Sequence, residues 1–233
     1  MKSSLTIQCI GYEIAADWYE GNNSILLVLP GFTSSKANYE DLVTAIVNKT
    51  DMSALVVDYS GHGESPFDIQ DITISENFSE VVRAYDWVKD NYPEKTIDVM
   101  GTSYGGYFAA MLSGVRDVRN LILRVPANYD PKDLYTPWRN LDSEQIRNEY
   151  RADPKNFDNH PVLTRGPLFK GNAYVLTHEF DEACPKSSTD PYIKAFGAEH
   201  WEAKGFVHGL GKSKFTEEQL EEYQNKIAEW LTK

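Results

Sequence analysis

Short apolar runs rich in β-branched residues alternate along this chain with segments in which hydrophobic residues recur at helical spacing. This alternation is typical of a mostly parallel β-sheet with helices on both faces. We therefore expect an α/β fold with about eight strands, of which the first two form a hairpin. The predicted strands cover residues 4–10, 14–19, 24–29, 54–58, 96–100, 120–125, 173–177 and 198–203.

Four stretches show the single apolar stripe that allows a helix to pack on a sheet. These stripes run over residues 39–47, 78–88, 108–115 and 220–231. The last stripe is preceded by Thr216-Glu217-Glu218-Gln219, which predicts a capping box at the start of that helix.

Between Pro126 and Gly171 the alternation gives way to a stretch rich in proline, charge and aromatic residues, in which only Ser143–Arg151 has a helical pattern. A structureless loop of this length is unusual inside a compact domain. We therefore predict a lid, over about residues 126–171, inserted into a single domain that spans residues 1–233. The aromatic side chains of the lid suit an apolar or aromatic acyl group, and they suit equally well the packing of the lid on the core.

Charge and cysteine content restrict the class of partner. The chain has 23 Lys and Arg against 35 Asp and Glu, a formal net charge of −12, which disfavours nucleic acid and anionic membrane surfaces. No apolar run approaches the roughly 18 residues that span a bilayer, and the first residues lack the apolar stretch of a secretory signal, so a cytoplasmic location is expected. Cys9 and Cys184 are too few for a disulfide framework or a metal knuckle, and we expect free thiols, no metal and no cofactor.

The motif with the strongest chemical implication is Gly101-Thr102-Ser103-Tyr104-Gly105, which directly follows a predicted strand and precedes a helical stripe. A serine on so tight a strand-to-helix turn needs neighbours without side chains, and the turn presents its hydroxyl to a substrate. It also lies at a helix N-terminus, where N–H groups stabilise developing negative charge. The motif predicts Ser103 as a nucleophile, against the alternative of a chance match in an ordinary loop.

A second element of such a site follows the first central strand, at Leu29-Pro30-Gly31-Phe32. We predict that the main-chain N–H groups of Phe32 and Tyr104 form an oxyanion hole for the carbonyl oxygen of the substrate. Pro30-Gly31 could also be only a turn.

These motifs together resemble the α/β-hydrolase superfamily, and within it the small esterases and serine-aminopeptidase-like hydrolases. Gly31-Phe32-Thr33, Asp58-Tyr59-Ser60-Gly61-His62-Gly63-Glu64-Ser65 and the Ser103 turn stand in the order of that family over nearly the whole chain. The usual His-Gly before the oxyanion residue is Pro30-Gly31 here, a difference that keeps the backbone donor. The stretch from Gly31 to Ser103, with Thr73-Ile74-Ser75, is similar to bacterial feruloyl and cinnamoyl esterases.

A serine needs a base, and the base needs an acid that holds it in one tautomer. His208 is the predicted base because it lies in a loop after the last predicted strand and before the last helix, as the catalytic histidine of the family does. The resemblance implies a structural role for His62. Packing or solvation explains the other three histidines, His160, His178 and His200, of which His178 is the chief competitor for the base.

The acid is expected after the predicted strand 173–177, where Asp181 fits the Asp-x-x-x-Pro ending of the family. Glu179 and Glu182 are close enough in sequence to replace it, and Asp130 occupies another position from which related enzymes supply the acid. The order serine, acid, histidine matches this fold.

The sequence thus predicts a serine esterase that cleaves a small-molecule carboxylic ester through an acyl-enzyme intermediate. An aminopeptidase or an acyl-thioester hydrolase with the same three residues is the main alternative. A binding protein that kept the fold and lost catalysis is disfavoured, because it would not need Ser103, Asp181 and His208 together. The acyl preference and the oligomeric state are not predicted.

Overall fold

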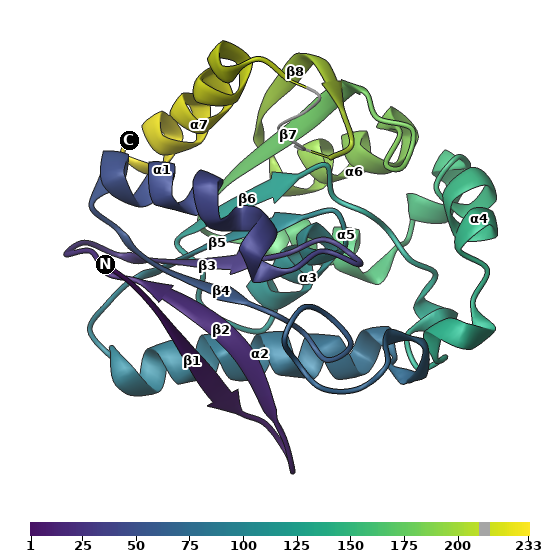
Figure 1. Ribbon diagram of the computed structural model, residues 1–233. Coiled ribbons are helices and arrows are strands. Elements are labelled where there is room, and N and C mark those ends of the chain that lie inside the picture. The colour runs from purple at the N-terminus through teal and green to yellow at the C-terminus, as the bar shows by residue number, and fades with distance from the viewer. Residues whose placement is uncertain (210–214) are drawn as a thin grey trace.

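One twisted sheet organises the chain in the computed structural model, which describes residues 1–209 and 215–233 (Figure 1). The described residues form eight strands in the order β1-β2-β4-β3-β5-β6-β7-β8. β1 and β2 form an antiparallel hairpin, β2 pairs antiparallel with β4, and every later neighbouring pair is parallel. Their bounds are β1 Lys2–Gln8, β2 Glu13–Tyr19, β3 Ile25–Leu29, β4 Ser53–Val57, β5 Ile97–Thr102, β6 Asn120–Arg124, β7 Asn172–Phe180 and β8 Glu199–Val207. The predicted α/β fold is confirmed.

Helices cover both faces of the sheet (Figure 1). The α-helices are α1 Glu40–Thr50, α2 Ile74–Asn91, α3 Tyr104–Ser113, α4 Ser143–Gln145, α5 Pro161–Arg165, α6 Lys186–Phe196 and α7 Glu217–Leu231. α1 and α7 pack on one face, and α2, α3 and α6 contribute to the core on the other. The predicted capping box of α7 is present, with the Thr216 side chain and the Gln219 side chain each accepting the other residue's backbone N–H.

Burial on both faces explains why the central strands are apolar throughout. In β3, Leu26 and Val28 belong to the core under α1 and α7, whereas Ile25, Leu27 and Leu29 belong to the core on the other face. Successive side chains of a strand point to opposite faces, so a strand covered on both sides needs an unbroken apolar run.

Three sequence expectations differ from the structure. The stripe that was extended to Val115 ends earlier, because α3 stops at Ser113 and Val115 is 43% exposed. α6 was not predicted, since its sequence is largely polar and contains Pro191. The segment between β6 and β7, residues 125–171, is called the β6–β7 insertion. A helix was expected there over Ser143–Arg151 alone, but α5 is also helical. It starts with a proline, a residue favoured at the first helical position.

Several short turns make up the β6–β7 insertion. α4 continues into a π-helical turn over Ile146–Tyr150, and short 3₁₀ turns start after Asp130 and Asp153, whose side chains accept backbone N–H groups. Within the described residues, no helix is long and apolar enough to cross a membrane.

Candidate active site

Ser103 lies on the sharp turn between β5 and α3. Its backbone has φ 53° and ψ −110°, a conformation that is unusual for a residue other than glycine. A Cβ on Gly101 would lie 2.0 Å from the Gly105 carbonyl oxygen, and a Cβ on Gly105 would lie 2.0 Å from the Leu29 carbonyl oxygen. Glycine at position 101 therefore allows the turn to pack against itself, as the motif predicts. Glycine at position 105 allows the turn to pack against the end of β3.

The structure brings Ser103 and His208 together, although 105 residues separate them in sequence. The Nε2 atom of His208 lies 3.0 Å from the Ser103 Oγ atom, and its Nδ1 atom lies 2.7 Å from Oδ2 of Asp181. An ionised carboxylate can only accept, so Nδ1 carries the proton and Nε2 is left to accept from the serine hydroxyl. This tautomer is the one that a general base requires.

Asp181 is held in turn by the backbone that follows it. Its Oδ1 atom accepts hydrogen bonds from the N–H groups of Ala183, at 2.9 Å, and Cys184, at 2.8 Å. The carboxylate is almost fully buried, with 2% of its side chain exposed, while the His208 side chain is 32% exposed. The turn therefore fixes one oxygen of Asp181 and leaves the other to hold His208.

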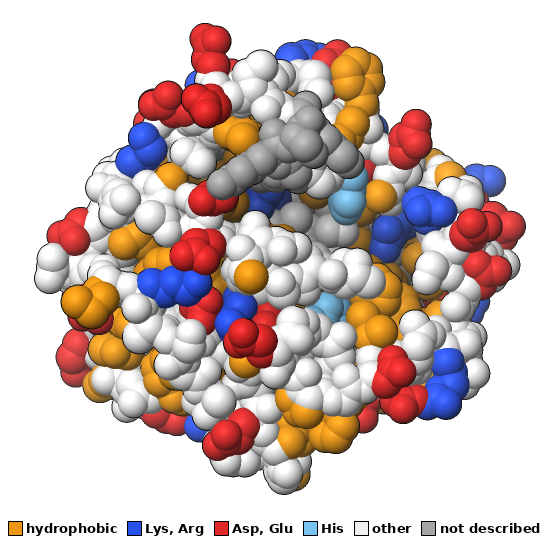
Figure 2. All heavy atoms as spheres, viewed as in Figure 1, with side chains coloured by type: hydrophobic (Ala, Val, Ile, Leu, Met, Phe, Trp, Pro, Cys, Tyr) orange, Lys and Arg blue, Asp and Glu red, His pale blue; other side chains and the backbone are white. Residues whose placement is uncertain are grey.

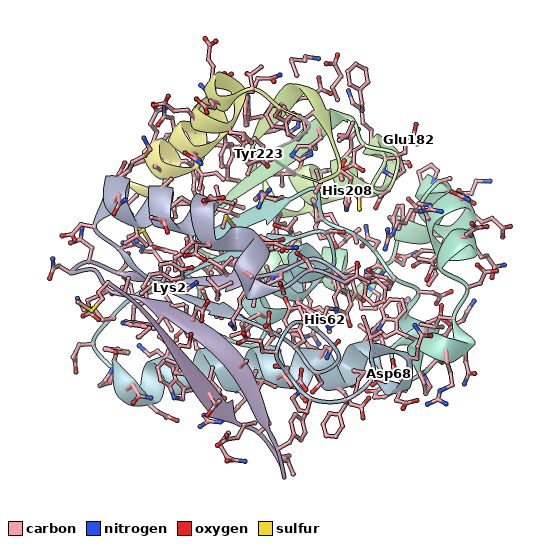
Figure 3. The ribbon with its side chains drawn as sticks, in the orientation of Figure 1. Lys2, His62, Asp68, Glu182, His208 and Tyr223 are labelled. Atoms are coloured by element: carbon pink, nitrogen blue, oxygen red, sulfur yellow. The ribbon has the colours of Figure 1, made fainter. Side chains whose placement is uncertain are left out.

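The alternative acids lie elsewhere. Glu182 is exposed, Glu179 accepts a hydrogen bond from the Gly205 N–H at 2.9 Å, and Asp130 forms an ion pair with Lys132. Figure 3 labels Glu182 near the outer edge of the molecule and His208 further in. Of the four candidates, only Asp181 is hydrogen-bonded to His208 in the described part of the chain.

His178, the chief competitor for the base, is buried in β7 and engaged in other contacts. Its Nδ1 donates to the Val207 carbonyl at 2.6 Å, and its Nε2 accepts from the hydroxyl of Tyr223 at 3.0 Å. Burial, followed by the nearby charge of Arg124, lowers the pKa of His178 to about 4. Neutral His178 therefore holds the carbonyl of Val207, the residue that immediately precedes His208.

The remaining histidines make structural contacts. His62 donates from Nδ1 to the Ser60 carbonyl at 3.0 Å, and burial lowers its pKa. His160 caps the first turn of α5, and Nε2 of His200 lies 2.8 Å from the Thr177 hydroxyl.

The predicted oxyanion donors lie beside the serine. A Cβ on Gly31 would be 3.7 Å from the Cβ of Ser103, which places the backbone of the β3 end against the turn. Tyr104 is the first residue of α3, so its N–H has no acceptor within the helix. Among the described residues no acceptor is found for the Phe32 N–H either. Both N–H groups therefore remain able to donate a hydrogen bond to another group.

A cleft of about 590 Å³ opens next to Ser103 and His208, on the face of the sheet that α1 and α7 cover. Figure 2 shows this side of the molecule hollowed beside a histidine side chain. The described lining residues are Gly31, Phe32, Ser34, Asn38, Tyr39, Asp41, Leu42, Thr102, Ser103, Arg124, His208, Gly209, Leu220, Tyr223 and Gln224.

The aromatic residues of the β6–β7 insertion mostly pack against the core. Trp138 is 5% exposed, and its ring lies 4.1 Å from that of Phe32 and 5.7 Å from that of Tyr104, centre to centre. Tyr135 is the exception, with 78% of its surface exposed. Of the two uses predicted for these aromatics, the contacts favour the packing of the insertion on the core.

Two buried arginines near the site were not identified from the sequence. Arg151, in the insertion, donates to the carbonyls of Asn128 and Ala183 at 3.1 and 3.0 Å, and so ties the insertion to the turn that holds Asp181. Arg124 is the last residue of β6 and lines the cleft. A charged residue at the end of a buried strand is the signal that could have identified Arg124, whereas nothing in the local sequence indicates the role of Arg151.

Cys9 and Cys184 are unpaired. The Cys184 Sγ atom lies 3.9 Å from Ser103 Oγ, and burial raises the pKa of this thiol to about 11. Within the described residues, no group of three or more His, Cys, Asp or Glu side chains is arranged to hold a metal ion.

Comparisons with known proteins agree with this architecture. The esterase Pf2001 of Pyrococcus furiosus is 19% identical, with a TM-score of 0.73 over 99% of this chain and 92% of that chain. Est1E from Butyrivibrio proteoclasticus, solved with ferulic acid bound, is 18% identical, with a TM-score of 0.73 and 97% of each chain covered. A monoacylglycerol lipase from Paleococcus ferrophilus is 16% identical, with a TM-score of 0.70 over 94% of this chain and 98% of that chain.

No curated protein matches the sequence at a significant level. At the identities above, likeness to solved structures shows a shared fold alone. The family described as alpha/beta hydrolase fold, however, matches the sequence itself over residues 24–161, more than half of the chain. Together with the eight-stranded sheet, this match confirms the resemblance inferred from the motifs, and the chain belongs to the alpha/beta hydrolase fold family.

Proposed function

We propose that this protein hydrolyses carboxylic esters, with Ser103 as nucleophile, His208 as general base and Asp181 as the acid that orients it. One observation carries the proposal: the continuous path from the carboxylate through the imidazole to the hydroxyl, with separations of 2.7 and 3.0 Å. Both separations are within normal hydrogen-bond range, and proton transfer requires this contact. The named esterases among the structures of the same fold support the same activity class.

In the acylation step, Ser103 Oγ forms a bond to the carbonyl carbon of the ester while its proton passes to His208 Nε2. The carbonyl oxygen gains a negative charge, and we assign its stabilisation to the N–H groups of Phe32 and Tyr104. The tetrahedral intermediate then collapses. The bond to the leaving alkoxide breaks, and the alkoxide takes the proton from His208.

Deacylation repeats these steps with water. His208 Nε2 removes a proton from a water molecule, whose oxygen attacks the acyl carbon, and the bond to Ser103 Oγ breaks as the proton returns to the serine. The carboxylate of Asp181 stabilises the imidazolium in both halves of the reaction. Net reaction converts ester and water into carboxylic acid and alcohol.

The lining of the cleft does not favour the aminopeptidase alternative. A site for the amino terminus of a peptide needs carboxylates, and Asp41 is the sole acidic residue among the described lining residues. Arg124, on the same cleft, would repel an ammonium group. We therefore propose esters over peptides as the substrate class.

The test is labelling with a fluorophosphonate probe, together with hydrolysis of short para-nitrophenyl esters and a feruloyl ester. Wild type should label and turn over, and Ser103→Ala and His208→Ala should lose about four to six orders of magnitude in kcat. His200→Ala is the matched control, because His200 contacts Thr177 and should be dispensable. Near-normal turnover by Ser103→Ala would refute the proposal.

A further inference from the structure

Arg124 is a buried cation whose side chain lies between two aromatic rings. It is 2% exposed. Its Nε donates to the hydroxyl of Tyr223 and its Nη1 to Oγ1 of Thr102, both at 3.0 Å. The guanidinium carbon lies 5.1 Å from the centre of the Tyr223 ring and 5.9 Å from that of Tyr39. These neutral contacts hold the side chain in place and leave its positive charge uncompensated.

No carboxylate forms an ion pair with Arg124 in the described part of the chain. Residues 210–214, outside it, contain no Asp or Glu in their sequence. By contrast, Arg119, just before the same strand, pairs with Asp98, and the nearly buried Lys36 pairs with Asp17. Because a buried charge without a counter-ion costs free energy, a buried arginine of this kind indicates a binding role.

Arg151 is the other buried arginine near the site, and its surroundings differ. It donates to two backbone carbonyls and packs over the ring of Tyr129 at 4.8 Å. It is not among the described residues that line the cleft. Arg151 is therefore enclosed by protein groups, and we assign it no ligand.

Arg124, in contrast, borders the cleft at the position next to the predicted nucleophile. Its three neighbours Thr102, Tyr39 and Tyr223 all line the cleft of about 590 Å³. Thr102, the last residue of β5, pairs with Arg124 in the sheet, and the N–H of the next residue, Ser103, donates to the Arg124 carbonyl at 2.9 Å. A substrate whose carbonyl group reaches Ser103 from this cleft passes the guanidinium.

We propose that Arg124 binds a carboxylate carried by the ester substrate, and so selects esters with a negatively charged group. The inference rests on the proposed function, because it names the substrate class of the same site. A guanidinium offers donors in the planar fork that a carboxylate accepts, and hydrogen bonds between charged partners are stronger than neutral ones. Asp41, the acidic residue among the described lining residues, is exposed, whereas Arg124 is buried, so the selectivity is assigned to Arg124.

The experiment compares esters that differ only in charge. One pair is para-nitrophenyl hydrogen adipate and para-nitrophenyl hexanoate, with the carboxylate on the acyl side. The other pair is meta-acetoxybenzoate and meta-methylphenyl acetate, with the carboxylate on the alcohol side. We expect wild type to favour the charged member of at least one pair by about tenfold or more in kcat/KM.

The variants separate binding by Arg124 from a merely structural role. Arg124→Met should abolish the preference, and Arg124→Gln, which keeps hydrogen-bond donors without the charge, should reduce it. Arg147→Met removes an exposed arginine of the insertion and should keep the preference. Tyr223→Phe removes one hydrogen-bond partner of Arg124 but keeps the charge of the arginine, and this variant should also keep the preference. A preference that survives in Arg124→Met, or the absence of a preference in wild type, overturns the inference.

A binding measurement makes the outcome independent of catalysis and of the folding of the arginine variants. Adipate should raise the midpoint of thermal unfolding of Ser103→Ala, since a ligand that binds only the folded state stabilises it. The neutral analogue adipamide should not. If fluorophosphonate labelling and hydrolysis fail but adipate still binds, the proposed function is wrong and the anion site stands. If labelling succeeds and adipate neither binds nor is preferred as an ester, the anion site is wrong and the proposed function stands.

Discussion

Replacing Asp181 with asparagine should lower kcat by about three to four orders of magnitude. The variant loses the negative charge beside His208, and it holds the imidazole of His208 in the wrong tautomer. The amide oxygen of the variant must stay where Oδ1 accepts from the N–H groups of Ala183 and Cys184. The amide NH₂ then faces Nδ1 of His208, which has to become the acceptor. The proton moves to Nε2, and the imidazole can no longer accept a proton from Ser103.

The charge contribution can be worked from the same geometry. A carboxylate 2.7 Å from an imidazolium nitrogen contributes about 6 kcal/mol at an effective dielectric constant of about 20. This value is an upper bound, because 32% of the His208 side chain is exposed and water screens the pair. Since each 1.36 kcal/mol is about tenfold in rate, the bound corresponds to about four orders of magnitude.

The assay is steady-state hydrolysis of para-nitrophenyl butyrate, with circular dichroism to verify folding. Glu182→Gln and Asp130→Asn are the matched controls, since each removes one carboxylate that does not contact His208, and both should retain most of the activity. The reasoning is refuted if Asp181→Asn stays within tenfold of wild type, or if Glu182→Gln loses as much.

Further predictions concern stability. Tyr223→Phe should reduce the free energy of unfolding by about 1–3 kcal/mol, because His178 and Arg124 each lose a buried partner; an unchanged urea midpoint would argue against that network. Gly105→Ala should cost about 3 kcal/mol or prevent folding, since its new methyl group would clash with the Leu29 carbonyl, and soluble expression at wild-type stability would contradict this. His178 alone should account for a loss of at most about 3 kcal/mol of wild-type stability as the pH drops from 6.5 to 4, because the unfolded chain then protonates His178 more readily than the folded one. Urea unfolding at pH 7 and pH 4.5 tests this, and an equal loss in His178→Gln would count against it.

Much of the fold is predictable because burial on both faces leaves a clear pattern in the sequence. β3 is apolar at every position, and α7 combines a stripe with a capping box. α6 lacks such a pattern, since its first turn is Lys-Ser-Ser-Thr and Pro191 lies inside it. Its buried residues, Ser188, Thr189 and Tyr192, are mostly polar, so their burial depends on partners from distant parts of the chain.

The predicted site residues differ in how far sequence alone could identify them. Ser103 can be identified from the local sequence, because its turn accepts only glycine at positions 101 and 105. The choice between Asp181 and Glu182 depends on which side chain the turn directs toward His208, and that is a property of the folded backbone. The contact between Arg151 and the Ala183 carbonyl joins elements 32 residues apart, and nothing near either residue indicates it.

The hydrogen bond from the Ser103 N–H to the Arg124 carbonyl fixes the backbones of these two residues relative to each other. Neighbouring strands are held about 4.8 Å apart by their ladder, and this spacing does not change when surface loops move. The ladder therefore fixes the backbone positions from which the hydroxyl and the guanidinium extend, and this limits the spacer length of a ligand that contacts both. Sequence variation in the surrounding loops could alter access to the cleft while leaving that length unchanged.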